Sequence, residues 1–296
     1  MKILNNPHPE ITIFAKCPYC SFEGVNAFKF HTRYYFRCDA CGLIYHHRQN
    51  HDSTATLSYY QHGYFDDYAG DQITKKQSGF YRNILLLIEQ KIDPGSILDI
   101  GCGCGYFLKE ASDRNWNTFG LDPSEQSITI AQSLIGNRVL CGTVKNMNND
   151  RLFDAITLIN VLDHMSDAFS ELDIITSYLK QRGLLYIRVP NGFFHISMLQ
   201  LFKKSPDFIS PYLVFHEYSF TRAFLIRCLT DKGFTNIKIR CAHLSGYDLY
   251  SHTGFFSRIA KIFVKNIIWS FVKIVEVISH GRWLLGPSIE ITAIKE

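Results

Sequence analysis

The chain has 296 residues, 46% of them hydrophobic, and a mean hydropathy of -0.04. This composition argues against an intrinsically disordered chain and provides enough apolar side chains for one large core with a small module beside it. The net charge of +4, from 31 basic and 27 acidic residues, neither requires nor excludes a polyanionic partner. The N-terminal segment lacks a secretory pattern and no long stretch is free of charges, so we expect a cytoplasmic protein.

Two cysteine pairs lie near the N-terminus. Each pair has the form C-x-x-C, and seventeen residues separate the two pairs. This is the spacing of a four-cysteine zinc site, in which each pair forms a tight turn and four thiolates complete a tetrahedron. Because such a site leaves no coordination position for a substrate, we predict a structural zinc ribbon within residues 1–50. Its ligands are Cys17, Cys20, Cys38 and Cys41.

Polar residues follow the predicted ribbon. The segment 49–55 has the composition of a linker, so we place the second domain at 56–296. The aromatic segment 59–65 either packs the linker onto that domain or lines the entrance to a site. Three histidines near the cysteines are alternative zinc ligands, although a complete cysteine set favours packing or solvated roles for them. They are His31, His46 and His47.

A strand, a glycine turn and a helix follow in the second domain. The apolar run 96–100 leads into Gly101, Gly103 and Gly105, and the next residues have helical character. Glycines permit a sharp turn and let a ligand approach main-chain N–H groups. Their alternate spacing departs from the G-x-G-x-x-G dinucleotide pattern. The carboxylate of Asp99 just before the turn disfavours a pyrophosphate and favours the ammonium group of a ligand.

The next predicted strand, 118–121, ends at Asp122, about twenty residues beyond the turn. A carboxylate at this place can accept hydrogen bonds from both hydroxyls of a ribose. Ser124 is predicted to be the N-cap of the following helix. The alternative interpretations involve no ligand. In these, the glycines form an ordinary turn and Asp122 caps a helix.

Three segments in this order resemble successive motifs of class I S-adenosylmethionine (SAM) methyltransferases. They are 98–105, 120–124 and 153–165, and the resemblance covers roughly residues 80–240. It implies an α/β fold with a Rossmann-like sheet of seven mainly parallel strands. Helices would flank the sheet, and SAM would lie over the C-terminal ends of the strands.

The resemblance also implies roles for individual residues. Asp99 and the three glycines would hold the methionine end of SAM, and Asp122 would hold the ribose. Thr143 and Val144 stand where many family members carry an acidic pair, so main-chain contacts would recognise the adenine there. Asn160 would lie at the rim beside the methyl donor. Related quinone-biosynthesis methyltransferases carry an acidic residue at this position and bind a metal there, so the asparagine argues against a catalytic metal.

Methyl transfer needs an aligned acceptor, and a base where the acceptor must lose a proton. His164 is one candidate base with Asp163 as its orienting partner, although neighbours on a helix do not face each other. His216 is the second candidate, because family members often carry a histidine before this helix. The alternatives are a packing role at a helix start for His164 and helix capping for His216. Tyr212 and Glu217 are weaker candidates.

The C-terminal third contains three further predicted features. An aromatic-rich insertion at about 190–217 is expected to cover the acceptor pocket. Residues 255–280 form a predicted amphipathic helix with a wide apolar face and a basic edge. This face docks onto the core, which is the favoured interpretation, or contacts an anionic membrane. The alternating segment 288–294 is predicted to be the last strand, at the antiparallel edge of the sheet.

A zinc module ahead of such a core resembles sugar methyltransferases of bacterial polysaccharide clusters. We therefore predict SAM-dependent methylation of a small molecule or glycoconjugate precursor, by C- or O-methylation of a sugar or of a lipid-linked acceptor. A ribosomal or transfer RNA methyltransferase is the second hypothesis, against which the weak net charge argues. A non-catalytic SAM-binding module is the third.

Overall fold

The structure is a computed structural model of the chain. It describes residues 16–23, 25–31, 33–46, 58, 78–147, 151–203, 213–243 and 255–296. The predicted linker, the aromatic segment 59–65, His47 and Tyr212 lie outside these residues. The predicted insertion is described on either side of residues 204–212.

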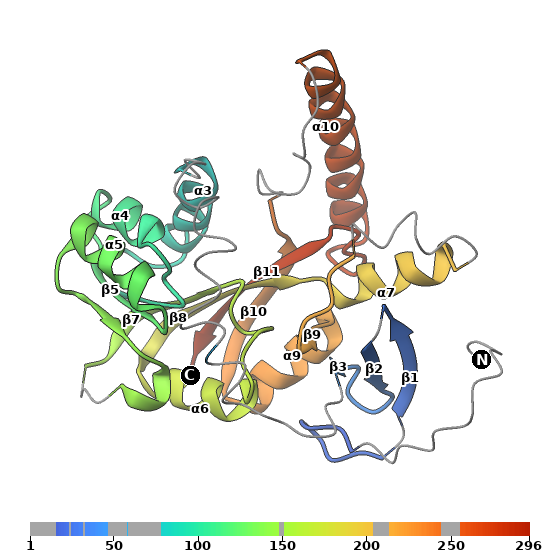
Figure 1. Cartoon of the computed structure of the whole chain (residues 1–296), viewed down its shortest axis with the longest axis horizontal. Coiled ribbons are helices and arrows are strands. Elements are labelled where there is room, and N and C mark those ends of the chain that lie inside the picture. The colour runs from blue at the N-terminus through green and yellow to red at the C-terminus, as the bar shows by residue number, and fades with distance from the viewer. Residues whose placement is uncertain are drawn as a thin grey trace.

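Seven strands form the main sheet, in the order β10-β11-β8-β7-β4-β5-β6 (Figure 1). Neighbouring strands from β6 to β8 are parallel, whereas β11 pairs antiparallel with both β8 and β10. The strands are β4 (Ser96–Ile100), β5 (Asn117–Asp122), β6 (Val139–Cys141), β7 (Phe153–Ile159), β8 (Leu179–Pro190), β10 (Phe234–Cys241) and β11 (Ser288–Lys295). The predicted Rossmann-like, mainly parallel sheet of seven strands is confirmed.

The position of β11 corrects one expectation. The alternating segment 288–294 does form an antiparallel strand, but it lies between β8 and β10, and β10 takes the edge. Glu290 and Thr292, which give the alternation its polar positions, are both buried. Glu290 accepts hydrogen bonds from Arg240 Nε (2.7 Å) and Tyr186 Oη (2.7 Å). The polar residues that alternate along this strand are therefore buried within the protein and do not form a solvent-exposed face.

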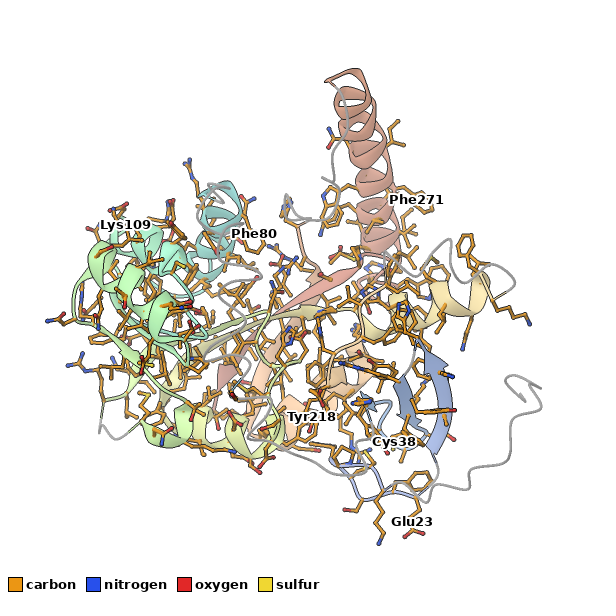
Figure 2. All side chains as sticks on the ribbon, viewed as in Figure 1. Glu23, Cys38, Phe80, Lys109, Tyr218 and Phe271 are labelled. Carbon is orange, nitrogen blue, oxygen red and sulfur yellow. The ribbon has the colours of Figure 1, made fainter. Side chains whose placement is uncertain are left out.

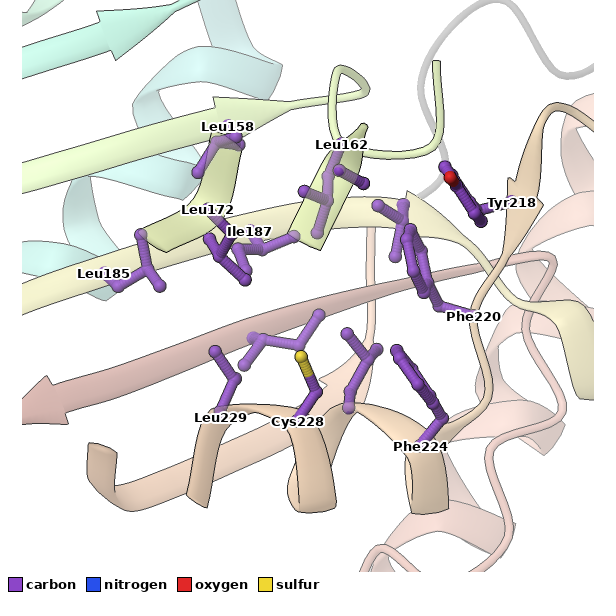
Figure 3. Packing of buried hydrophobic residues seen from close by; sticks show 14 of the residues in the cluster. Leu158, Leu162, Leu172, Leu185, Ile187, Tyr218, Phe220, Phe224, Cys228 and Leu229 are labelled. Atoms are coloured by element: carbon purple, nitrogen blue, oxygen red, sulfur yellow. The ribbon is translucent and has the colours of Figure 1, made fainter. Parts of the chain in front are cut away.

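Helices cover both faces of the sheet because alternate strand residues point to opposite sides. Ile97 packs in the cluster formed with α3, α4 and α5, whereas Leu98 and Ile100 pack in the cluster formed with α6 and α9. In Figure 3, Phe224, Cys228 and Leu229 of α9 lie below the strands that contribute to the cluster with α6 and α9. The helices are α3 (Ser78–Glu89), α4 (Tyr106–Ser112), α5 (Glu125–Ile135), α6 (Ala168–Ser177), α7 (Gly192–Leu201), α9 (Arg222–Asp231) and α10 (Phe255–Ile278).

The predicted ribbon forms a second, smaller sheet in the order β1-β2-β3-β9. Three of its strands come from the N-terminal segment: β1 (Val25–Phe30), β2 (Arg33–Cys38) and β3 (Ile44–His46). The fourth, β9 (Tyr218–Ser219), comes from the second domain and pairs antiparallel with β3. The small sheet therefore joins residues that lie more than 170 positions apart in the sequence.

The predicted helix at 255–280 is present as α10, which extends away from the sheet (Figure 1). Val272 is buried, and Lys273 Nζ donates to the carbonyl oxygen of Cys241 at 3.0 Å. Ile267, Phe271 and Ile274 follow at spacings of four and three residues, so they share another face of the helix. Their side chains are 54%, 59% and 56% exposed. Val272 and Trp269 pack with the core cluster, as the favoured expectation of docking requires, whereas the face of Ile267, Phe271 and Ile274 stays exposed.

Candidate functional site

The glycine turn joins the end of β4 to α4. Gly101, Gly103 and Gly105 have φ values of 71°, 51° and 79°, a region that side chains other than glycine rarely adopt. A Cβ atom at Gly101 would lie 2.4 Å from Cγ2 of Val161. The Gly101 N–H donates to the carbonyl oxygen of Leu121 (2.7 Å), which holds the turn against the end of β5. Conformation and space thus both require glycine at this edge of the sheet.

Asp122 ends β5 beside this turn. Its Oδ2 accepts the Gly103 N–H (2.9 Å), and its Oδ1 accepts the Ser124 N–H (2.9 Å). These two bonds fix the plane of the carboxylate, while a carboxylate retains about two further lone-pair sites for a ligand. Ser124 is the N-cap of α5, as predicted, because its side chain accepts the Ser127 N–H.

Asp99 lies on β4, beneath the glycine turn, and is 3% exposed. Its Oδ1 accepts the hydroxyl of Thr157 at 2.6 Å. Burial raises the pKa of Asp99 to about 7, and the neighbouring charge of Asp122 adds to this effect. A buried carboxylate with a raised pKa gains from a cationic group placed beside it. This is the environment expected for a residue that would face the ammonium group of a ligand.

Thr143 and Val144 follow the short strand β6. Gly142, with a φ of 148°, donates its N–H to the carbonyl oxygen of Asp122 (2.9 Å), so this turn lies next to the Asp122 end of β5. The Thr143 hydroxyl donates to Oδ1 of Asn146 (2.8 Å), and the Val144 side chain is buried. The carbonyl oxygens of Thr143 and Val144 also accept internal hydrogen bonds, from the N–H groups of Asn146 (2.9 Å) and Met147 (3.3 Å). Main-chain recognition of an adenine at this turn stays a prediction.

Asn160 follows β7 and has a positive φ of 58°. Its side-chain Oδ1 accepts a hydrogen bond from Nη1 of Arg188, which lies on β8 and is 4% exposed. The Arg188 guanidinium also lies over the ring of Phe80, 5.1 Å from its centroid. Sequence reasoning missed Arg188, although a single charge in the apolar run 184–189 could have identified it.

Asp163, His164 and His216 lie close together. Oδ2 of Asp163 is 3.5 Å from Nε2 of His164 and 3.6 Å from Nε2 of His216, and the two imidazole centroids are 3.8 Å apart. Residues 162–164 form a turn ahead of α6, so the expectation that helical geometry separates Asp163 from His164 does not apply. The Asp163 side chain is fully buried, and its oxygens have no hydrogen-bond partner within the part of the chain that the structure describes.

Burial determines the protonation state of the two imidazoles in this group. Burial lowers the pKa of His164 and of His216 to about 4. The nearby carboxylate of Asp163 partly offsets this effect at His216. Burial in turn raises the pKa of Asp163 above its usual range. Both imidazoles are therefore neutral at pH 7, and a pKa of about 4 makes each of them a weak base.

The same three side chains place their ligand atoms within 4.8 Å of one another, as four cysteines do in the ribbon. Two imidazoles and one carboxylate are a donor set that divalent transition metals accept. The prediction that no catalytic metal binds beside Asn160 stays a prediction.

The four cysteines form a compact cluster. Sγ of Cys17 lies 3.5 Å from Sγ of Cys41, and Sγ of Cys20 lies 3.6 Å from Sγ of Cys38. Zn–S bonds of ~2.3 Å in a tetrahedron place sulfur atoms about 3.8 Å apart, so the spacing fits a zinc ion. Cys38 is fully buried and Cys20 is only partly buried. The cluster is compatible with a structural zinc site.

Comparisons with known proteins agree with this arrangement. A family model described as a methyltransferase domain matches residues 71–239, more than half of the chain. The ubiquinone biosynthesis O-methyltransferase of Bradyrhizobium diazoefficiens is 29% identical over 100 residues, which cover 32% of this chain and 40% of that protein. The mitochondrial enzyme of that name from Rattus norvegicus is 28% identical over 128 residues, 38% of this chain and 37% of that protein. The chain thus matches less than half the length of either relative.

Solved structures share the fold. Magnesium protoporphyrin IX methyltransferase from Synechocystis PCC 6803, solved with bound S-adenosylhomocysteine (SAH), has a TM-score of 0.53 and 14% identity. It covers 83% of this chain and 100% of its own. A plantazolicin methyltransferase in complex with a desmethylplantazolicin analogue and SAH has a TM-score of 0.52 and 19% identity, over 83% of this chain and 96% of its own. At these identities the likeness establishes the fold alone.

Proposed function

Since this chain belongs to the methyltransferase-domain family, we propose that it transfers a methyl group from SAM to a small-molecule acceptor. The observation that carries the proposal is the edge formed by the left-handed glycine turn and the fixed carboxylate of Asp122. Asp99 would face the ammonium group, and the main chain at Thr143 and Val144 would face the adenine. The ubiquinone biosynthesis enzymes and the plantazolicin methyltransferase are named for small-molecule or peptide acceptors, which supports this class.

The acceptor we propose is a hydroxyl or carbon of a sugar or glycoconjugate precursor. SAM supplies an electrophilic methyl group, so the protein must align the acceptor and take up its proton where one is lost. His216 or His164 would be the base, because both imidazoles are neutral at pH 7 and partly accessible, with side chains 32% and 26% exposed. Asp163 would orient them. Asn160, held by Arg188, would lie beside the methyl donor.

Titration calorimetry with SAM and SAH tests the cofactor assignment. We expect both ligands to bind the wild-type chain, and Asp122→Ala to weaken binding at least tenfold because a ribose partner is lost. Asp113→Ala is the matched control, since Asp113 is an exposed carboxylate paired with Lys109. Lys109 is labelled in Figure 2. A well-folded protein that binds neither ligand would refute the proposal.

Formation of SAH in the presence of nucleotide sugars then tests the acceptor class. RNA methylation is the alternative, and the net charge of +4 gives it little support. Binding of RNA that falls steeply with added salt would favour that alternative, because neutralised phosphates release counterions. Binding of SAM without turnover of any acceptor would leave a SAM-binding module.

We propose in addition that α10 contacts an anionic membrane surface. Within the described residues no helix is long and apolar enough to cross a membrane. An amphipathic helix with a basic edge binds at the interface of an anionic membrane. The exposed apolar face at Ile267, Phe271 and Ile274 supports the proposal. The helix sequence also carries four basic residues against one acidic residue. Such contact would place the enzyme at the inner face of the membrane, where a lipid-linked acceptor would be available.

Vesicle sedimentation tests this contact. We expect sedimentation with vesicles containing phosphatidylglycerol, weaker sedimentation at high salt, and loss of binding in a Phe271→Glu/Ile274→Glu variant. Leu86→Glu, on α3, is the control because Leu86 is also an exposed apolar residue. A concentration-dependent dimer that the double substitution abolishes would instead identify this face as an interface between copies of the chain.

A further inference from the structure

The zinc ribbon is hydrogen-bonded to the segment that carries His216. Strand β3 pairs with β9, with Ile44 opposite Ser219 and Tyr45 opposite Tyr218. One residue further, the His46 N–H donates to the carbonyl oxygen of Glu217 at 2.9 Å. The ladder therefore extends to the residue next to His216.

A second contact holds the other side of His216. The hydroxyl of Tyr35, on β2, donates to the carbonyl oxygen of Phe215 at 2.9 Å. The Phe215 ring packs against the rings of Phe28, Phe30 and Tyr35, with centroids 5.5, 4.9 and 5.3 Å away. Strands β1 and β2 thus provide a wall for Phe215. His216 lies between two residues whose carbonyl groups are both bonded to the ribbon.

The same segment also fixes the position of Asp163. The Tyr218 N–H donates to the carbonyl oxygen of Asp163 at 3.2 Å, and the Tyr218 hydroxyl donates to that of Ser166 at 3.2 Å. Figure 3 shows Tyr218 and Phe220 beside Leu162, the residue that precedes Asp163. The ribbon, β9 and the turn of Asp163 and His164 are therefore connected by consecutive hydrogen bonds.

The cysteine cluster lies at the start of this connection. Cys38 ends β2, and its N–H donates to the carbonyl oxygen of Leu43 at 2.9 Å, just before β3. The Gly42 N–H donates back to the carbonyl oxygen of Cys38 at 2.9 Å. Figure 2 shows Cys38 on the ribbon side of Tyr218. A zinc ion that fixes the turn at Cys38 and Cys41 would therefore also fix the start of β3.

We propose that zinc bound by the four cysteines positions His216 against Asp163, so that zinc occupancy controls the acceptor side of the site. The proposal rests on the methyltransferase function inferred above. The glycine turn and Asp122 belong to the other sheet, and among the residues that the structure describes their hydrogen bonds involve no ribbon residue. Removal of zinc should therefore disorganise the acceptor side and leave SAH binding intact.

Hydrogen exchange of the whole 296-residue chain, measured with zinc and after chelation, tests this. In the chelated protein the amides of His46 and Tyr218 should exchange at least tenfold faster, while that of Gly101, bonded to Leu121, stays protected. The imidazole NMR signals of His216 should shift at the same time, and added zinc should reverse both changes. SAH titration of the same samples should give affinities within twofold of each other.

Tyr35→Phe tests the connection without disturbing the cysteines. It removes the hydroxyl bonded to Phe215 and keeps the ring, so zinc content should be unchanged while the amide of Tyr218 exchanges several-fold faster. Tyr34→Phe is the matched control, since Tyr34 is the exposed neighbour on the same strand.

Two results would overturn the positioning role. The first is a purified protein without zinc. The second is a chelated protein in which the amides of Cys38 and Gly42 exchange freely while Tyr218 keeps its protection. Failure of the methyltransferase function would be recognised separately, because the zinc-loaded protein would then fail to bind SAH whatever the exchange experiment shows.

Discussion

At the scale of single residues, burial disfavours the ionised form of the Asp99 carboxylate unless a cation lies beside it. Burial raises its pKa to about 7, so in the free protein the group is protonated below that pH. Binding of a ligand ammonium favours the ionised form and requires loss of this proton.

We therefore predict that SAH affinity increases from pH 6 to pH 8, approaching ~tenfold per pH unit at the acidic end because one proton is released. Calorimetry in buffers of different ionisation enthalpy measures that proton directly. Asp99→Asn should bind more weakly and without this pH dependence. An unchanged pH dependence in the variant would show that another group titrates.

His216 gives a second prediction at this scale. Its pKa is lowered to about 4 by burial, so its imidazole NMR signals should stay constant from pH 8 to about 5 and shift only below that. Asp163→Asn should lower the midpoint further, because the carboxylate partly offsets burial. His216→Gln identifies the signal by removing it. A midpoint near the ordinary histidine value of ~6.5 would contradict a partly buried imidazole that is neutral at pH 7.

At the scale of elements, the start of α5 depends on a single side chain. Ser124 is 1% exposed, and its Oγ accepts the N–H of Ser127 at 3.3 Å. Replacement of an N-cap serine by alanine costs about 1 kcal/mol. We expect this loss for Ser124→Ala in urea unfolding monitored by circular dichroism. Ser133→Ala, within the same helix, should cost less because Ser133 is exposed and caps no helix start.

At the scale of the whole molecule, ribbon and methyltransferase core share one apolar cluster. Phe36, Leu43 and Tyr45 of the ribbon belong to the same buried cluster as Leu158 of β7 and Phe224 of α9. A shared core makes unfolding cooperative. The zinc-loaded protein should therefore unfold in one thermal transition, at the same temperature by near-ultraviolet and far-ultraviolet circular dichroism.

Removal of zinc should lower that transition temperature by several degrees, because an ion that binds the folded chain stabilises it. Differential scanning calorimetry with and without chelator measures the change. Two separated transitions in the loaded protein would show that the ribbon unfolds as an independent unit.

Local sequence patterns were sufficient for the elements that depend on local geometry. The strand before Gly101, the cap at Ser124 and the paired cysteines each follow from the conformation or chemistry of a few neighbouring residues. The left-handed φ values of Gly101 and Gly105 and the packing of Cys17 on Cys41 agree with those expectations. The roles of the candidate site residues remain predictions that the experiments above address.

Contacts between distant residues required the tertiary structure. The alternating segment 288–294 does not reveal that β11 lies inside the sheet. In the sequence, a buried glutamate cannot be distinguished from an exposed one, and only the tertiary structure shows that Arg240 donates to Glu290. Likewise no spacing within the chain indicates that β3 pairs with β9. The sequence by itself determined the glycine turn and the cysteine set, since these depend on short-range order, and the α/β class followed from the resemblance of three ordered motifs to class I SAM methyltransferases. The tertiary structure decided which segments meet at His216, because that depends on packing between residues far apart in the chain.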